Sequence, residues 1–276
     1  MEKLDILMIC CNNELYFQHI FPILHQRLES LGVNWYVYEN NSTDSTVEML
    51  EELDRKFSNF TLITQNTLRY QNKYINIMFA RKNLTNWYFQ NVKTDNKWVV
   101  WLDTNILLDD KSITSLLESS QRNPKGKMFT SFTDYLHENN SKYYYDILAY
   151  NYGKFFRTSR SPTLMWNDIC ADNLSLNQDD SIDVNLESKI LTGFGGLALV
   201  CRESLGKINW KLQRCLSVNN LRIPPVIVCE HWAFQEELRD LGNIYMVKNT
   251  GTLWFMDHVF RDSRKMSDIK KKLDSV

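Results

Sequence analysis

Three groups of polar and ionisable side chains directly follow apolar segments that are expected to be buried strands. In chain order, they are Glu39 to Thr46, Asp103 to Asn105, and Glu230 with His231. In an open parallel sheet, ligands bind at the edge formed by the carboxyl ends of the strands. We therefore expect these groups to contribute to one site at one edge of one sheet.

The second group has the composition of a cation site. Asp103 ends the apolar run Trp98–Leu102, and Asn105 brings a second oxygen two residues later. Mg²⁺ and Mn²⁺ take hard oxygen ligands, so these two residues can hold a divalent cation against a diphosphate. His231 and His258 are further candidates for a metal or phosphate contact. A turn capped by Asp103 is the alternative interpretation.

The first group combines a helix start with an unexplained acid. Ser42, Thr43 and Asp44 are typical N-cap residues, and Glu48 permits a capping-box contact. Glu39 ends the preceding strand and is not explained by capping. A carboxylate in that place can accept hydrogen bonds from a base or a ribose, so a capped helix and a nucleotide site both stay open.

Two further features lie near these groups. Arg81 and Asn83 are on the helix expected before the strand 97–103, and the planar fork of an arginine can clamp a phosphate. The run Gly193–Gly196 precedes an apolar segment but is not G-x-G-x-x-G, which disfavours a dinucleotide site. Its glycines either let the backbone approach a ligand or make a tight turn.

The elements that must position these residues alternate between strand and helix. The hydrophobic pattern predicts strands at 4–11, 34–39, 60–65 and 97–103, and helices at 13–31 (kinked or split by Pro22), 44–57 and 73–91. Such alternation predicts an α/β fold: a Rossmann-like, mostly parallel sheet flanked by helices in a single domain.

The second half of the chain is less regular. It predicts helices at 110–120 and 231–241, strands at 127–132 and 243–248, and a glycine-rich loop with a strand over 191–201. Because neither a Gly/Pro/Ser-rich linker nor a repeat interrupts the sequence, we expect one domain over residues 1–250. Its donor half is 1–133 and its acceptor half 134–250. Residues 251–276 form a C-terminal extension with a basic tail.

Composition excludes several classes of partner. The formal net charge is −1, with 32 basic and 33 acidic residues, so no global field attracts nucleic acid. No apolar run reaches the roughly 20 residues that span a bilayer, and the N-terminus lacks a signal peptide. The six Cys predict reduced thiols. We expect a cytoplasmic protein whose basic tail is a candidate membrane contact, and the sequence predicts no oligomeric state.

Several motifs resemble those of one enzyme class. The run Val37–Thr46 resembles the acid-rich turn after the second strand of GT-A glycosyltransferases. Phe79–Leu84 looks like their Ala-Arg-Asn-x-Leu element, and Trp101–Ile106 stands where their Asp-x-Asp motif stands. Gly195–Ala198 and Cys229–Phe234 are similar to their later acceptor-loop and acid motifs. Within that class, the chain resembles the fungal capsule-associated group of the cryptococcal α-1,3-mannosyltransferase type.

The resemblance covers roughly residues 4–250 and implies a GT-A fold and a hexosyltransferase. Its substrates would be a UDP- or GDP-sugar donor and a glycan or other hydroxyl acceptor, and its cofactor Mn²⁺ or Mg²⁺. The implied donor-binding residues are Tyr38, Glu39, Asn40, Asp44, Arg81, Asn83, Asp103 and Thr104. The implied acceptor-binding residues are Asp146, Gly195, Gly196 and Trp232.

Glu230 and Asp103 would be the catalytic residues, and the metal would contact Asp103, Asn105, His231 and His258. One residue departs from the family pattern: Asn105 replaces the second acid of Asp-x-Asp and brings no charge, which puts metal dependence in doubt. It also keeps open a non-catalytic nucleotide-sugar or carbohydrate-binding module. A sugar-nucleotide nucleotidyltransferase is the other alternative, although the segment Cys11–Glu14 lacks the glycine-rich basic loop that such an enzyme needs.

Overall fold

The computed structural model describes most of the chain. The described residues are 3–65, 70, 73–108, 111–136, 142–144, 169, 177, 182–183, 185–210, 214–215, 226–227 and 230–254.

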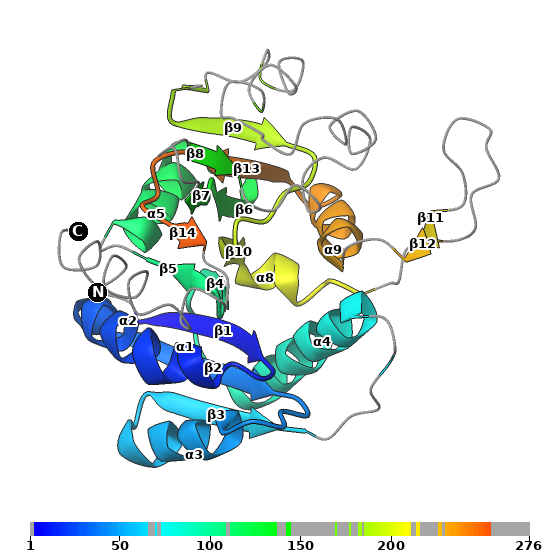
Figure 1. Ribbon diagram of the computed structural model, residues 1–276. Coiled ribbons are helices and arrows are strands. Elements are labelled where there is room, and N and C mark those ends of the chain that lie inside the picture. The colour runs from blue at the N-terminus through cyan, green and yellow to red at the C-terminus, as the bar shows by residue number, and fades with distance from the viewer. Residues whose placement is uncertain are drawn as a thin grey trace.

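An eight-stranded sheet forms the centre of the protein, in the spatial order β3-β2-β1-β4-β10-β6-β13-β9 (Figure 1). Its strands are β1 (Leu4–Cys10), β2 (Val33–Glu39), β3 (Phe60–Thr64), β4 (Trp98–Asp103), β6 (Gly126–Ser131), β9 (Glu187–Ile190), β10 (Leu197–Cys201) and β13 (Asn243–Val247). The first four are parallel, as the alternation predicts. The chain order reverses between β1 and β4, which makes this the place where an α/β sheet binds its ligand.

The second half joins the same sheet with mixed directions. Strand β10 is antiparallel to both neighbours, β4 and β6, and β9 is antiparallel to β13. A smaller sheet has the order β5-β14-β7-β8, and a separate pair joins β11 and β12. These short strands are β5 (Ile106–Leu107), β7 (Asp134–Leu136), β8 (Lys142–Tyr144), β11 (Arg214–Cys215), β12 (Val226–Ile227) and β14 (Leu253–Trp254).

Helices cover both faces of the large sheet (Figure 1). One face packs against α1 (Glu14–His19), α2 (Phe21–Leu28), α3 (Thr46–Lys56) and α5 (Ser112–Arg122). The other packs against α4 (Lys73–Asn91), α8 (Arg202–Leu205) and α9 (Glu230–Arg239). Successive residues of β1 alternate between the two cores, with Ile6 and Met8 in the first and Leu7 in the second. This alternation follows from the two-residue period of a strand.

The helix predicted at 13–31 is split, as Pro22 indicates. The break falls at Ile20, and α2 begins one residue before Pro22, in a first turn that tolerates a residue without an N–H. A 3₁₀ turn, η1 (Glu29–Leu31), follows and ends at Gly32 with a φ of 61°. A left-handed residue of this kind is where a helix commonly ends in glycine.

At the edge of the sheet opposite the carboxyl ends, Asp5 is fully buried near the start of β1. Its Oδ2 accepts hydrogen bonds from the Tyr88 hydroxyl at 2.6 Å and from Asn96 Nδ2 at 3.1 Å. Its Oδ1 accepts one from Asn34 Nδ2 at 2.9 Å. These bonds compensate a buried carboxylate and tie β1 to β2 and α4.

No helix in the described part of the chain is both long and apolar enough to cross a bilayer. In the described part of the chain, Cys10 and Cys201 are buried free thiols.

Candidate functional site

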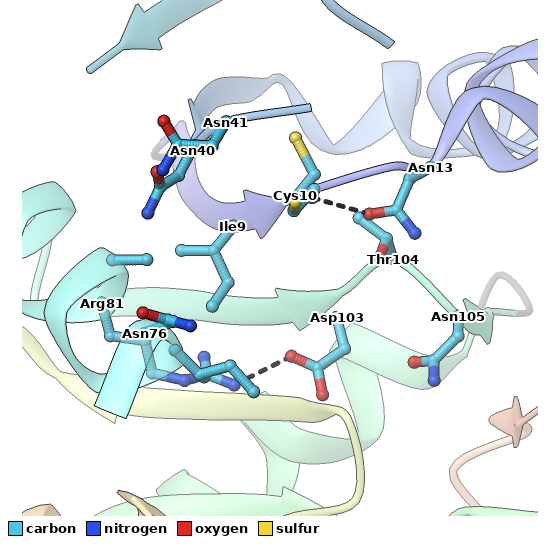
Figure 2. A pocket seen from close by; sticks show the side chains of 13 residues that line it. Ile9, Cys10, Asn13, Asn40, Asn41, Asn76, Arg81, Asp103, Thr104 and Asn105 are labelled. Carbon is cyan, nitrogen blue, oxygen red and sulfur yellow. Dashed lines mark hydrogen bonds and ion pairs between the residues drawn. The ribbon is translucent and has the colours of Figure 1, made fainter. Parts of the chain in front are cut away.

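A cavity of about 410 Å³ opens where β1, β2 and β4 end, beside α4 (Figure 2). This is the edge at which the sequence predicts a ligand site. The lining residues are Ile9, Cys10, Cys11, Asn13, Asn40, Asn41, Asn76, Ile77, Ala80, Arg81, Asp103, Thr104 and Asn105. Two of the three groups predicted from the sequence therefore contribute side chains to one cavity.

An ion pair forms one side of the cavity. Arg81 from α4 donates to Asp103 Oδ1 at the end of β4, with a distance of 2.9 Å (Figure 2). The Arg81 side chain is 4% exposed and that of Asp103 is 23% exposed. Burial raises the pKa of Asp103, and the charge and hydrogen bond of Arg81 partly offset that increase. The pair thus places a carboxyl group and a guanidinium at the cavity, both largely removed from water.

The acidic side chains of the turn after β2 accept hydrogen bonds from backbone N–H groups of the same turn. Glu39 is 3% exposed, and its Oε1 accepts the backbone N–H of Ser42 at 2.6 Å. Helix α3 has Ser45 as its N-cap, without a side-chain cap bond, and Asp44 Oδ1 instead accepts the N–H of Thr46 at 3.1 Å. Neither Glu39 nor Asp44 is among the cavity-lining residues. The N-cap is thus Ser45 and not one of the predicted residues Ser42, Thr43 and Asp44, although Glu39 and Asp44 both accept backbone N–H groups of this turn.

A second loop, after β1, fixes the position of this turn. The backbone N–H of Asn12 donates to Ser42 Oγ at 2.9 Å, and Asn12 Oδ1 accepts the N–H of Thr43 at 2.7 Å. Asn12 and Asn41 have positive φ values of 55° and 58°, which asparagine adopts more readily than most residues. These contacts bring Asn40 and Asn41 to the cavity. Sequence reasoning missed the lining role of Cys10, Cys11 and Asn13, although this segment also follows a parallel strand.

Tyr38 and Asn83 form a hydrogen-bonded trio with Gln65. The Tyr38 hydroxyl donates to Gln65 Oε1 at 2.9 Å, and Asn83 Nδ2 donates to the Tyr38 oxygen at 3.1 Å. Neither residue is among those that line the cavity. The trio ties β2 to α4, the helix that carries Arg81.

The glycine-rich loop packs behind Asp103. The Gly196 carbonyl accepts the backbone N–H of Asp103 at 2.8 Å. Gly195 donates its N–H to Thr130 Oγ1 at 2.9 Å, and its carbonyl accepts from Ser131 Oγ at 3.0 Å. Gln235 of α9 bonds both the N–H and the carbonyl of Gly193, at 2.7 and 2.8 Å. Gly195 and Gly196 are buried in this network and do not line the cavity.

The third group lies one layer further back. His231 on α9 is 3% exposed and stacks on Phe194, with ring centroids 4.2 Å apart. It does not line the cavity. Glu230 is the first residue of α9, but the side chains of Glu230 and Trp232 lie outside what the structure describes. Asp146 and His258 lie outside the described residues.

The surroundings of His231 predict a dependence of stability on pH. Burial lowers the pKa of His231 well below its usual range, and the charge of Arg81 lowers it further. The unfolded chain protonates this imidazole below about pH 6.5 and then binds more protons than the folded chain, so acid destabilises the fold. We expect His231→Phe to remove this contribution, which approaches about 1.4 kcal/mol per pH unit below that value.

Urea unfolding of the natural protein and of His231→Phe at a series of pH values between 7 and 5 tests this. The two curves of unfolding free energy should diverge as the pH falls. Parallel curves would contradict the prediction. The same change at His19, which is partly exposed on α1, serves as the control.

Comparison with known proteins places the fold. The sequence matches no known protein family and no curated protein. Among solved structures, GalNAc-T7 with UDP, GalNAc and Mn²⁺ has a TM-score of 0.53 at 9% identity, over 92% of this chain and 43% of that one. TarS residues 1–349 of S. aureus has a TM-score of 0.49 at 9% identity, over 92% of this chain and 60% of that one.

A third structure is glucosyl-3-phosphoglycerate synthase of Mycobacterium tuberculosis with Mn²⁺, UDP and phosphoglyceric acid. It has a TM-score of 0.48 at 12% identity, over 99% of this chain and 78% of that one. The likeness to GalNAc-T7 identifies the fold of the present chain as GT-A, a single α/β domain around a mixed eight-stranded sheet. The chain spans 43% of GalNAc-T7 and 60% of the TarS fragment. At such low identity, the likeness defines the fold alone.

Proposed function

We propose that this protein is a glycosyltransferase that moves a sugar from a nucleoside-diphosphate donor to a hydroxyl acceptor. The observation that carries the proposal is the Arg81–Asp103 ion pair in a cavity at the strand-order reversal of a GT-A sheet. That is the place where this class of sheet binds ligands. A guanidinium at such a place is suited to the negative charge of a diphosphate.

The chemistry of the reaction gives these residues their roles. Sugar transfer passes through an oxocarbenium-like transition state, and negative charge develops on the leaving diphosphate. Arg81 stabilises that charge, because it is held in advance in a site largely removed from water. Asp103 orients Arg81 and faces the donor. An inverting reaction also needs a base on the acceptor hydroxyl, for which Glu230 at the start of α9 is our candidate.

Two residues at the end of β4 fit a divalent cation of the kind present in GalNAc-T7. Asp103 and Asn105 both line the cavity and offer a carboxylate and an amide oxygen. Among the described residues, no three His, Cys, Asp or Glu side chains gather to make a complete metal cage. Mg²⁺ usually binds by one or two carboxylates together with substrate phosphates. Such a cation supplies charge stabilisation to the diphosphate when it is bound there.

We assign the donor site to residues 1–133 and the acceptor site to 134–250, in line with the position of the cavity in the first half. The resemblance of the motifs to the fungal mannosyltransferase group supports transfer of a hexose, and both an inverting and a retaining reaction stay open. The cavity also includes Asn13, Asn40 and Asn41, whose amides offer both donors and acceptors to a nucleoside.

Calorimetry with UDP, GDP and the other nucleoside diphosphates, each with Mn²⁺ and with a chelator, tests the proposal. We expect at least one diphosphate, UDP or GDP, to bind far more tightly than its nucleoside, because Arg81 is proposed to contact the diphosphate. If no nucleoside diphosphate binds under either condition, the glycosyltransferase proposal is wrong. The comparison with chelator measures how much of the affinity depends on metal.

The neutral Asn105 favours one second candidate, a binding module that holds a nucleotide sugar without transferring the sugar. The same cavity serves both functions. Slow hydrolysis of the bound donor distinguishes the two functions, because a glycosyltransferase commonly transfers its sugar to water at a low rate. Release of nucleoside diphosphate measures this hydrolysis. A donor that binds and stays intact favours the module.

A further inference from the structure

The guanidinium of Arg81 lies against two aromatic rings. Its Cζ is 5.1 Å from the ring centre of Trp101 and 5.0 Å from that of Phe194. Phe194 in turn stacks on His231, with ring planes inclined by 22°. Arginine is attracted electrostatically to the faces of aromatic rings, and the attraction grows when water is excluded.

These rings come from parts of the chain that are far apart in sequence. Trp101 belongs to β4, Phe194 to the loop before β10, and His231 to α9. All three side chains are almost completely buried. A long arginine side chain has many rotamers. Packing against buried aromatic rings leaves few of them accessible and so restricts the position of the guanidinium.

The position of that charge matters because Arg81 also lines the cavity and pairs with Asp103 (Figure 2). Trp101 is part of the central sheet and lies two residues before Asp103 in the same strand. Phe194 and His231 instead approach Arg81 from the acceptor half. Without the Phe194 ring, the guanidinium would keep its pairing with Asp103 but lose the surface that fixes its plane.

We propose that Phe194 is a positioning residue that orients the Arg81 guanidinium toward the diphosphate of the donor, and that His231 supports it by stacking. The inference rests on the proposed function and deepens it. It links the loop before β10 and helix α9 to phosphate recognition, although neither lines the cavity. The affected quantity is the part of donor affinity that comes from the phosphates.

The test compares each nucleotide with its nucleoside. Binding of UDP and uridine, and of GDP and guanosine, is measured by calorimetry for the natural protein and for Phe194→Leu. We expect the variant to bind the preferred diphosphate about tenfold more weakly, within the range of a desolvated cation–π contact. Affinity for the nucleoside should stay unchanged, because Phe194 acts only through Arg81.

Phe129→Leu is the matched control. Phe129 is also fully buried and stacks on Tyr245 at 5.3 Å, but it belongs to the core on the other face of the sheet. This variant should lose stability without changing the ratio of nucleotide to nucleoside affinity. If Phe194→Leu does not fold, His231→Leu provides the second variant, with an expected loss of about threefold for the diphosphate.

A double-mutant cycle identifies Arg81 as the intermediary. In an Arg81→Leu background, Phe194→Leu should have no further effect on diphosphate affinity. An effect that persists without Arg81, or an equal loss of nucleotide and nucleoside affinity, overturns the positioning role. Failure of the natural protein to bind any nucleoside diphosphate contradicts the proposed function instead.

Discussion

Replacement of Asp103 by alanine is expected to abolish sugar transfer, with a loss of about a thousandfold or more. Among the described residues that line the cavity, Asp103 is the one acid, and it pairs with Arg81 at 2.9 Å. Its removal takes the Asp103 carboxylate away from a guanidinium that is 4% exposed, and loss of a buried charge partner is strongly unfavourable. The variant therefore loses both the contact that orients Arg81 and the carboxylate contact to a cation.

Release of nucleoside diphosphate from a radiolabelled donor measures the effect, and circular dichroism verifies that the variant is folded. Asp54→Ala is the control, because Asp54 is exposed on α3 and accepts a hydrogen bond from the backbone N–H of Leu62, away from the cavity. If Asp103→Ala retains transfer, the assignment of the site is wrong, although the GT-A fold stands.

Gly195→Ala is expected to destabilise the protein by about 4 kcal/mol, at the upper end for a single substitution. A Cβ on Gly195 would lie 1.9 Å from the backbone oxygen of Ser131, a contact that no side-chain rotation relieves. The same segment holds the hydrogen bonds from Gly195 to Thr130 and Ser131. Relief of the clash therefore also breaks buried hydrogen bonds, each of which is costly to leave unmade.

Urea denaturation gives the free energy of unfolding for this comparison. Gly206→Ala is the matched control, because a Cβ there meets only the Phe89 ring, at 3.2 Å or more, and the backbone φ is −66°. We expect Gly206→Ala to change stability by less than about 1 kcal/mol. Equally small losses of stability at the two glycines would mean that the loop before β10 adjusts to the added methyl group. That result would also weaken the proposed positioning role of Phe194.

Much of the first half could be predicted from the sequence because its signals are local. The period of apolar residues and the position of Pro22 predicted the parallel strands and the split helix. The direction of β10 could not be predicted, because a five-residue buried strand reads the same in either direction. The small sheet was missed because its strands have only two or three residues.

The site was predicted in part. Arg81, Asp103 and Asn105 share one cavity, as their positions at strand ends and on the intervening helix indicate. Glu39 is predicted to contact a nucleotide, and that prediction is untested; the hydrogen bond from the N–H of Ser42 to its Oε1 could not be predicted, because it depends on the exact path of the turn. The loop after β1 was missed because asparagines carry no charge and match no motif.

The antiparallel strand β10 has a consequence for how the protein is made. Trp98 of β4 pairs with Cys201, so β4 acquires its second neighbour only after about a hundred more residues have been synthesised. Strand β6 leaves the ribosome earlier but lies on the far side of β10. Until β10 inserts, β4 presents an unpaired edge, and such edges favour aggregation of nascent chains. The aromatic support of Arg81 arrives with the same late segment, so a truncated chain would contain Arg81 and Asp103 but lack Phe194.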